Sequence, residues 1–145
     1  MPDEIPVPET GNPVWILPGH PPNTAPPYKY YPPVTDGEIG WIHITLVIFF
    51  REMPDAGDEN PVTLASDVHG VYDFNGSPID GGYIIDMKDK QSTTVRLKAK
   101  VTVPASKKPV SIPVTLSVKE KHGQMSKVIV ELHSHPQAPT TVPIL

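Results

Sequence analysis

His133 and His135 have the clearest chemical potential in this chain, because imidazole nitrogens are frequent zinc ligands. They lie two positions apart, and His122, His69 or a histidine of a second copy could complete a set of metal ligands. Two histidines with this spacing at a strand end can hold one metal only where the backbone is not flat. We therefore expect no metal and no cofactor, and His133 and His135 are the candidates if a metal binds.

The segment His133-Ser134-His135-Pro136 resembles the His-Ser-His-Pro zinc segment of the JAMM family of deubiquitinating metalloproteases. Membership of that family would also imply a serine and an aspartate further along the chain, with the aspartate as another zinc ligand. No acidic residue follows Glu131 in this sequence. The resemblance therefore implies no peptidase activity.

Two other kinds of site can be weighed from the residue types. Asp55, Asp58 and Glu59 offer hard oxygen ligands in one loop, which suits calcium, but their spacing does not match an EF-hand. No serine lies in a recognisable nucleophile elbow, and no glycine-rich loop could cradle a phosphate. We therefore expect a protein that is not an enzyme.

Aromatic side chains are spread through the proline-rich first part of the chain. Residues 1–37 hold 11 of the 20 prolines and show neither helical nor strand periodicity, which predicts a stiff extended arm. Large aromatic groups are scarce in solvated linkers, so we expect these to anchor the arm on a surface, either that of its own core or, as we favour, that of neighbouring subunits. The candidate anchors are Trp15, Tyr28, Tyr30 and Tyr31.

The formal net charge of −4 conceals a split along the chain. Residues 1–87 carry 13 acidic side chains and only two basic ones, whereas residues 88–127 carry ten basic side chains and only two acidic ones. The candidates for a charged interface are Arg96, Lys98, Lys100, Lys107 and Lys108.

Three interpretations of the basic residues remain open. They could keep surface strands soluble and resist edge pairing, or they could meet the acidic region of an adjacent copy and set the register of an assembly. The third is nucleic-acid binding, which we do not favour. Residues 88–127 contain no Tyr, Phe or Trp to stack on bases, and the protein is acidic overall.

The elements that must position these residues are strands. Apolar and polar side chains alternate through residues 93–103, which predicts a strand with one core face and one basic face. Residues 110–119 repeat the pattern, and the short polar connection between the two predicts a hairpin. Pro113 cannot donate to a ladder and predicts an edge strand. Further strands are expected over residues 39–50, 62–65, 68–74, 82–87 and 125–133.

Six or seven short strands without a helix predict an all-β fold, a single antiparallel β-sandwich that is immunoglobulin-like or jelly-roll-like. The sandwich is expected over residues 38–135, between the N-terminal arm (1–37) and a short extended C-terminal tail (136–145). Residues 67–74 with Gly81-Gly82-Tyr83 resemble the D-x-x-G-x-Y-x-F and G-x-Y pattern of carboxypeptidase-regulatory-like and Cna-B-type β-sandwiches. That resemblance implies the immunoglobulin-like form.

The start of the chain predicts no signal peptide, because it opens with acidic residues and is interrupted by prolines. The longest apolar run, residues 39–50, is shorter than the ~20 residues that a membrane-spanning helix needs, and predicts a buried strand. We expect synthesis in the cytoplasm and no contact with a membrane.

In organisation the chain resembles bacteriophage head-decoration (cement) proteins, in which a small cysteine-free β domain carries long extended tails that clamp neighbouring subunits. The resemblance implies a structural protein that is oligomeric in its assembly and incorporated into a virion. Its partners would be the major capsid protein and copies of itself. The alternative is a carbohydrate- or protein-binding immunoglobulin-like module or adhesin that presents loops such as residues 55–60.

Overall fold

The computed structural model describes residues 11–19, 28–32, 35–36, 39–102 and 108–135. Within these ranges the chain forms ten strands and no helix. The strands are β1 (Val14–Gly19), β2 (Tyr28–Tyr30), β3 (Thr35–Asp36), β4 (Ile39–Phe50), β5 (Pro61–Ser66), β6 (Val71–Asp73), β7 (Tyr83–Asp86), β8 (Ser92–Thr102), β9 (Ser111–Glu120) and β10 (Met125–His133).

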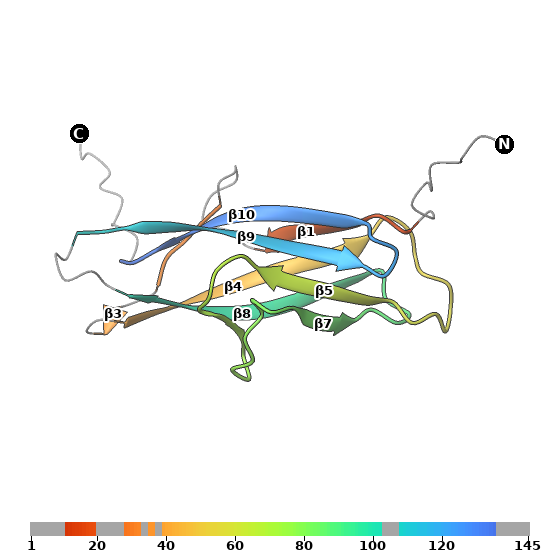
Figure 1. Cartoon of the computed structure of the whole chain (residues 1–145), viewed down its shortest axis with the longest axis horizontal. Helices are drawn as coiled ribbons and strands as arrows, with labels where there is room; N and C mark the ends of the chain where they lie inside the picture. The colour runs from red at the N-terminus through yellow and green to blue at the C-terminus, as the bar shows by residue number, and fades with distance from the viewer. Residues whose placement is uncertain (1–10, 20–27, 33–34, 37–38, 103–107, 136–145) are drawn as a thin grey trace, which may run out of the picture.

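The strands form two five-stranded sheets packed as a sandwich (Figure 1). The first sheet has the order β1-β4-β8-β6, with β3 paired to the start of β4, and the second has the order β2-β10-β9-β5-β7. Up to β9, successive strands mostly alternate between the sheets, so most loops cross from one layer to the other. The all-β prediction is confirmed. The prediction of a wholly antiparallel fold is wrong at β2, which runs parallel to β10.

The core fills the space between the two sheets. In β4 every second residue from Ile42 to Phe50 is buried, and in β8 Leu97, Ala99 and Val101 are buried while the residues between them face outward. This confirms the alternation predicted for β8. The second sheet buries a matching set, which includes Val62, Leu64, Val114, Leu116, Val118, Val130 and Leu132.

Part of the proline-rich segment belongs to the sandwich, so the predicted arm over residues 1–37 is wrong at these positions. β1 pairs with β4 and buries Val14 and Ile16, and β2 pairs with β10 and buries Tyr30. Both strands lie at sheet edges, where prolines are tolerated because one side of the strand has no ladder to support. The sandwich therefore starts before residue 38.

β8 and β9 do not form the predicted hairpin, because β8 lies in the first sheet and β9 in the second. β9 pairs instead with both β10 and β5, so the prediction that it is an edge strand is also wrong. Pro113 is accommodated because β5 contacts β9 only from Leu116 to Glu120. At Pro113 only β10 is paired, and the strand is locally an edge.

Several predictions fall on residues outside the described ranges. These are the C-terminal tail (136–145), the remainder of the arm, and the candidate interface residue Lys107. Within the described part of the chain, no helix is long and apolar enough to cross a membrane.

Tyr30 is placed for packing rather than for hydrogen bonding. Its ring joins the core, and its buried hydroxyl has no hydrogen-bond partner among the described residues. Burial, with a smaller contribution from Tyr28, raises the pKa of Tyr30 to about 12. A buried phenol stays protonated because its phenolate would lose hydration. At neutral pH the hydroxyl is therefore uncharged, and without a hydrogen-bond partner among the described residues it adds no stabilising interaction.

A pair of neighbouring substitutions tests whether β1 belongs to the core. Ile16→Ala should lower the free energy of unfolding by about 2–5 kcal/mol, because it removes buried apolar volume. Leu17→Ala removes a side chain that is 48% exposed and should cost less than about 1 kcal/mol. Urea unfolding followed by tryptophan fluorescence measures both values. Equal, small effects would show that β1 is detached from the sandwich.

Tyr30→Phe should leave stability at pH 7 unchanged or raise it by up to about 1 kcal/mol, because it removes only an unpartnered hydroxyl. The folded pKa of Tyr30 lies above the unfolded value of 10.0, so its stabilisation is complete below pH 10 and is lost as the pH rises toward 12. The variant should therefore lose less stability than the wild type over that window. Denaturation curves at a series of pH values, with Tyr72→Phe on the outer side of β6 as the control, measure this; equal losses in Tyr30→Phe and wild type would contradict the assignment.

Candidate docking face

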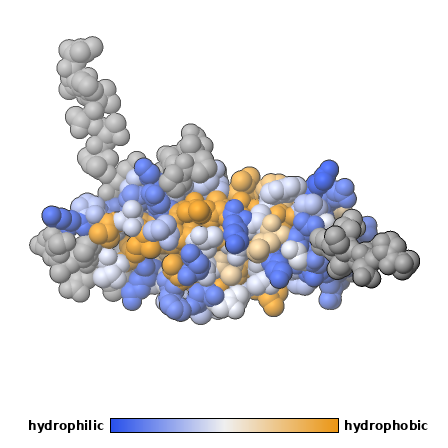
Figure 2. All heavy atoms as spheres, turned by 45° about the horizontal axis from the view of Figure 1, so that its top comes forward, coloured by the Kyte–Doolittle hydropathy of each residue, from blue (hydrophilic) through white to orange (hydrophobic). Residues whose placement is uncertain are grey.

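The outward side chains of the first sheet gather aromatic and basic groups on one surface, which we call the aromatic face. Trp41 on β4 is 41% exposed, and Trp15 on the neighbouring β1 is 39% exposed. Apolar side chains reach the surface elsewhere too, and on the side of the molecule drawn in Figure 2 they lie among more polar ones. The aromatic face consists of Trp15, Leu17, Trp41, His43, Thr45, Val47, Phe49, Tyr72, Phe74, Arg96, Lys98 and Lys100.

The rings of the aromatic face form pairs near its two ends. Trp41 and Phe49 are eight residues apart on β4, which places the two groups of rings about 26 Å from each other. Tilted ring pairs at these separations contribute attraction beyond the burial of their surface, so they hold one another in place. The pairs are Trp15–Phe49 (5.5 Å between centroids), Trp41–Tyr72 (6.1 Å) and His43–Phe74 (5.3 Å).

The positive charges of the aromatic face are not neutralised within the described chain. Nζ of Lys98 lies 5.2 Å from the ring centroid of Trp41, within the range of a cation–π contact. None of Arg96, Lys98 and Lys100 forms an ion pair with a described residue. The three strands β1, β4 and β8 contain no Asp or Glu at all. The face is therefore both aromatic and basic.

The turn after β6 positions Phe74 on this face. The Asp73 carboxylate accepts hydrogen bonds from the backbone N–H groups of Ser77 (2.8 Å) and Asn75 (2.9 Å). The Ser77 bond is the main cause that holds the pKa of Asp73 below its usual value, with the Tyr83 hydroxyl adding to it. The closed turn fixes the direction in which Phe74 leaves the strand toward His43.

The predicted metal candidates contact other residues of the chain. The ring of His133 lies 4.4 Å from that of Tyr31, and its Nε2 is 3.5 Å from Glu131 without the geometry of a hydrogen bond. Nδ1 of His135 contacts the Ser134 hydroxyl at 2.7 Å, and Ser134 is buried. Among the described residues, no group of three or more His, Asp or Glu side chains could hold a metal ion.

The structure brings together four of the residues predicted to bind a partner. Trp15, Arg96, Lys98 and Lys100 all lie on the aromatic face. The other predicted anchors serve the chain's own fold: Tyr28 and Tyr30 pack with the core, and Tyr31 packs on His133. The prediction of Tyr30 as an anchor on a partner is wrong, because its ring is buried in the core, whereas Tyr28 is only partly buried and its role as an anchor stays a prediction. Lys108 precedes β9 of the second sheet.

Trp41, His43 and Phe49 are not among the predicted site residues, because residues 39–50 were predicted to form a buried strand. The strand is confirmed as β4 with these bounds, but its alternate side chains from Trp41 to Phe49 are not buried. A signal was present: His43 and Thr45 are polar and two positions apart, which marks the solvent side of a strand. The same alternation places Trp41 and Phe49 on that side.

Comparison with known proteins shows a similarity of fold to a solved structure. No protein-family model matches the chain. No curated protein sequence matches it either. The fold is similar to that of the N-terminal domain of PorA, with a TM-score of 0.52, 10% identity, and coverage of 83% of this chain and 96% of that domain. At that identity the similarity shows the fold alone.

Two weaker structural similarities carry no argument about function. A lipoprotein from Bacteroides thetaiotaomicron has a TM-score of 0.44 and 13% identity, with 91% of this chain and 87% of that one covered. A family 123 glycoside hydrolase from Clostridium perfringens has a TM-score of 0.36 and 12% identity, with 72% of this chain and 22% of that one covered.

Asp73→Ala should lower the melting temperature at pH 7 and remove the contact between Phe74 and His43, which NMR cross-peaks between the two rings report. Because the folded pKa of Asp73 lies below the unfolded value of 3.8, its stabilisation is present above pH 3.8 and is lost as the pH falls through the folded value. The variant should therefore lose less stability than the wild type on acidification. Asp55→Ala, in an exposed loop, is the control; parallel acid profiles for wild type and Asp73→Ala would contradict this role.

Proposed function

We propose that this chain is a non-catalytic interaction module that docks onto another protein subunit of an assembly through the aromatic face. The observation that carries the proposal is that exposed rings share one sheet face with cations that make no ion pair with any described residue. Clustered exposed apolar groups of this kind mark interaction sites more often than chance. The narrower fold class, immunoglobulin-like or jelly-roll-like, is part of the proposal.

The composition of the aromatic face suits a protein partner. Trp, Tyr, Phe and Arg are enriched in the cores of protein interfaces, and Trp, Tyr and Arg contribute most of the binding energy there. The face offers Trp15, Trp41, Tyr72 and Arg96 on paired strands. Side chains held on a sheet lose less freedom on binding than side chains on a mobile loop, which favours affinity.

The partner should present acidic groups. Arg96, Lys98 and Lys100 project from a face whose main strands carry no carboxylate. Complementary charge raises the rate of encounter and orients the two surfaces. The same three cations repel basic surfaces, which makes such surfaces unfavourable partners.

Nucleic acid and carbohydrate fit part of this face. The lack of aromatic residues in the basic segment argues against nucleic acid, but the fold sets the ring of Trp41 on β4 beside Lys98 of that segment, so this reason no longer holds. We favour protein because the net charge of −4 repels a polyanion at long range. Exposed rings also suit sugars, and the experiment below separates these classes.

The virus-particle role implied by the organisation of the chain stays a prediction. β1 and β2 belong to the sandwich, so these two segments are not available to a free arm that clamps a neighbouring subunit. A decoration protein that docks through a folded face is compatible with the proposal.

A photo-crosslinking residue tests the docking face in the cells that produce the chain. Benzoylphenylalanine at Val47, in the middle of the face, should form an adduct with another protein, and the added substitutions Lys98→Glu and Lys100→Glu should reduce its yield at least about fivefold because they remove complementary charge. Thr115, on the outer side of the second sheet, is the matched control position. Mass spectrometry identifies the adduct. An adduct whose attached partner is removed by nuclease or by glycosidase, and is therefore not a protein, or an equal yield at Thr115, would overturn the proposal.

A further inference from the structure

One end of the sandwich carries charge opposite to that of the aromatic face. The loop between β4 and β5 holds four acidic residues, Glu52, Asp55, Asp58 and Glu59, and one basic residue, Arg51. Lys121 pairs with Asp58 at 2.8 Å, whereas the carboxylates of Glu52, Asp55 and Glu59 make no ion pair with a described residue. We call these three residues the acidic end.

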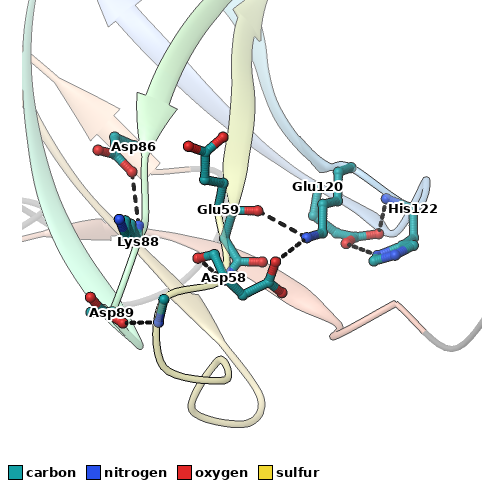
Figure 3. Close-up of polar contacts among 10 residues, drawn as sticks. Asp58, Glu59, Asp86, Lys88, Asp89, Glu120 and His122 are labelled. Atoms are coloured by element: carbon teal, nitrogen blue, oxygen red, sulfur yellow. Dashed lines mark hydrogen bonds and ion pairs between the residues drawn. The ribbon is translucent and has the colours of Figure 1, made fainter.

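The acidic end borders a cleft of about 640 Å³ whose walls come from three separate segments. The side chain of Asn12, before β1, donates to the backbone carbonyl of Glu52 (2.6 Å) and accepts from its N–H (3.0 Å). Nζ of Lys121, in the β9–β10 turn, donates to Asp58 and to the backbone carbonyl of Glu59 (Figure 3). These bonds connect the β4–β5 loop to the segment before β1 and to the β9–β10 turn.

The β9–β10 turn is itself held rigidly. The buried Glu120 carboxylate accepts the backbone N–H groups of His122 (2.8 Å) and Gln124 (2.9 Å), and its other oxygen contacts Nδ1 of His122 at 3.0 Å (Figure 3). The backbone at Gly11 passes so close that a Cβ there would collide with Glu120 and His122. The acidic end is therefore presented on a pre-formed surface.

We propose that the docking partner of the aromatic face is a second copy of this chain, which inserts its acidic end. This inference rests on the proposed function and names the partner. Every copy carries three cations on one surface, Arg96, Lys98 and Lys100, and the three carboxylates of the acidic end on another, and none of the six makes an ion pair with a residue that the structure describes. Each copy thus holds both halves of a complementary contact.

The contact joins two different surfaces and is therefore heterologous. Each copy uses its acidic end toward one neighbour and its aromatic face toward another, so association continues past two copies into a ring or an open array. A two-fold dimer through the aromatic face would instead oppose Arg96, Lys98 and Lys100 of both copies. No carboxylate on β1, β4 or β8 would offset that repulsion.

A single contact should be weak. The aromatic face extends about 26 Å along β4 and about 14 Å across four strands, a footprint on the order of 400 Å². That is about half of the ~800 Å² per partner in an interface of standard size. We expect dissociation constants in the micromolar range or weaker, with repeated contacts in an assembly adding avidity.

Sedimentation velocity of the full chain tests the inference. From about 10 to about 500 μM, the weight-average sedimentation coefficient should rise beyond the value for a dimer at about 50 mM salt, and the rise should be largely lost at about 500 mM salt. Lys98→Glu with Lys100→Glu, and Glu52→Lys with Asp55→Lys, should each weaken association at least about tenfold. Lys119→Glu with Lys127→Glu places the same charge change on the outer side of the second sheet and should associate like the wild type.

Mixing the two double variants gives the decisive outcome. Each variant alone should stay monomeric, whereas an equimolar mixture should associate again, because each copy offers the surface that the other has lost and the two reversed surfaces also complement each other. Recovery requires both variants to be folded, so it excludes loss by unfolding. No recovery in the mixture, or dimers that stop at two copies, would overturn the head-to-face contact.

The result is independent of the crosslinking experiment. A wild-type chain that stays monomeric while Val47 forms an adduct with a different protein would overturn self-association and leave the proposed function standing. A monomer without any protein adduct at Val47 would overturn both.

Discussion

The antiparallel pairing of β4 with β8 is the constraint on which the core and the docking face both depend. It runs from Ile39 opposite Thr102 to Phe49 opposite Ser92. Because side chains alternate along both strands, their inner sides form the centre of the core and their outer sides form the centre of the aromatic face. A slip by one residue would move the rings and cations inward and the core residues into water. Burial in the core therefore also holds the register of the face.

The alternation of strands between the two sheets determines which side chains are buried at the sheet edges and which loops meet at the ends of the sandwich. β1 and β2 are edge strands of different sheets. As a result Tyr30 is buried in the core and Trp15 is exposed on the surface. The crossing loops then converge at one end, where Asn12, Lys121 and Glu120 connect segments from both sheets. A module with ends tied in this way presents its charged surfaces at fixed positions relative to one another.

Charge separation by folding links the two proposals. The chain as a whole is mildly acidic, yet its first sheet is basic on the outside because Arg96, Lys98 and Lys100 alternate with core residues on a strand flanked by β4, which has no carboxylates. The acidic residues near the end of β4 lie beyond that sheet, in the loop that leads to β5. A chain with both surfaces can place the basic surface of one copy against the acidic surface of another. The small net charge of each copy does not prevent this contact.

The residue pattern alone predicts the all-β class, the two sides of β8 and the outward position of its cations, because alternation with a period of two is a local property of the chain. It predicted Trp15 as a surface anchor, but it could not show that Tyr30 would be buried in the core. Only long-range pairing places β8 and β9 in different sheets, sets β2 beside β10, and brings the ring of Trp41 on β4 beside Lys98 on β8. The reason is physical: strand neighbours are chosen by contacts between segments far apart in the chain, where burial of both inner faces at once selects one arrangement that no single segment encodes.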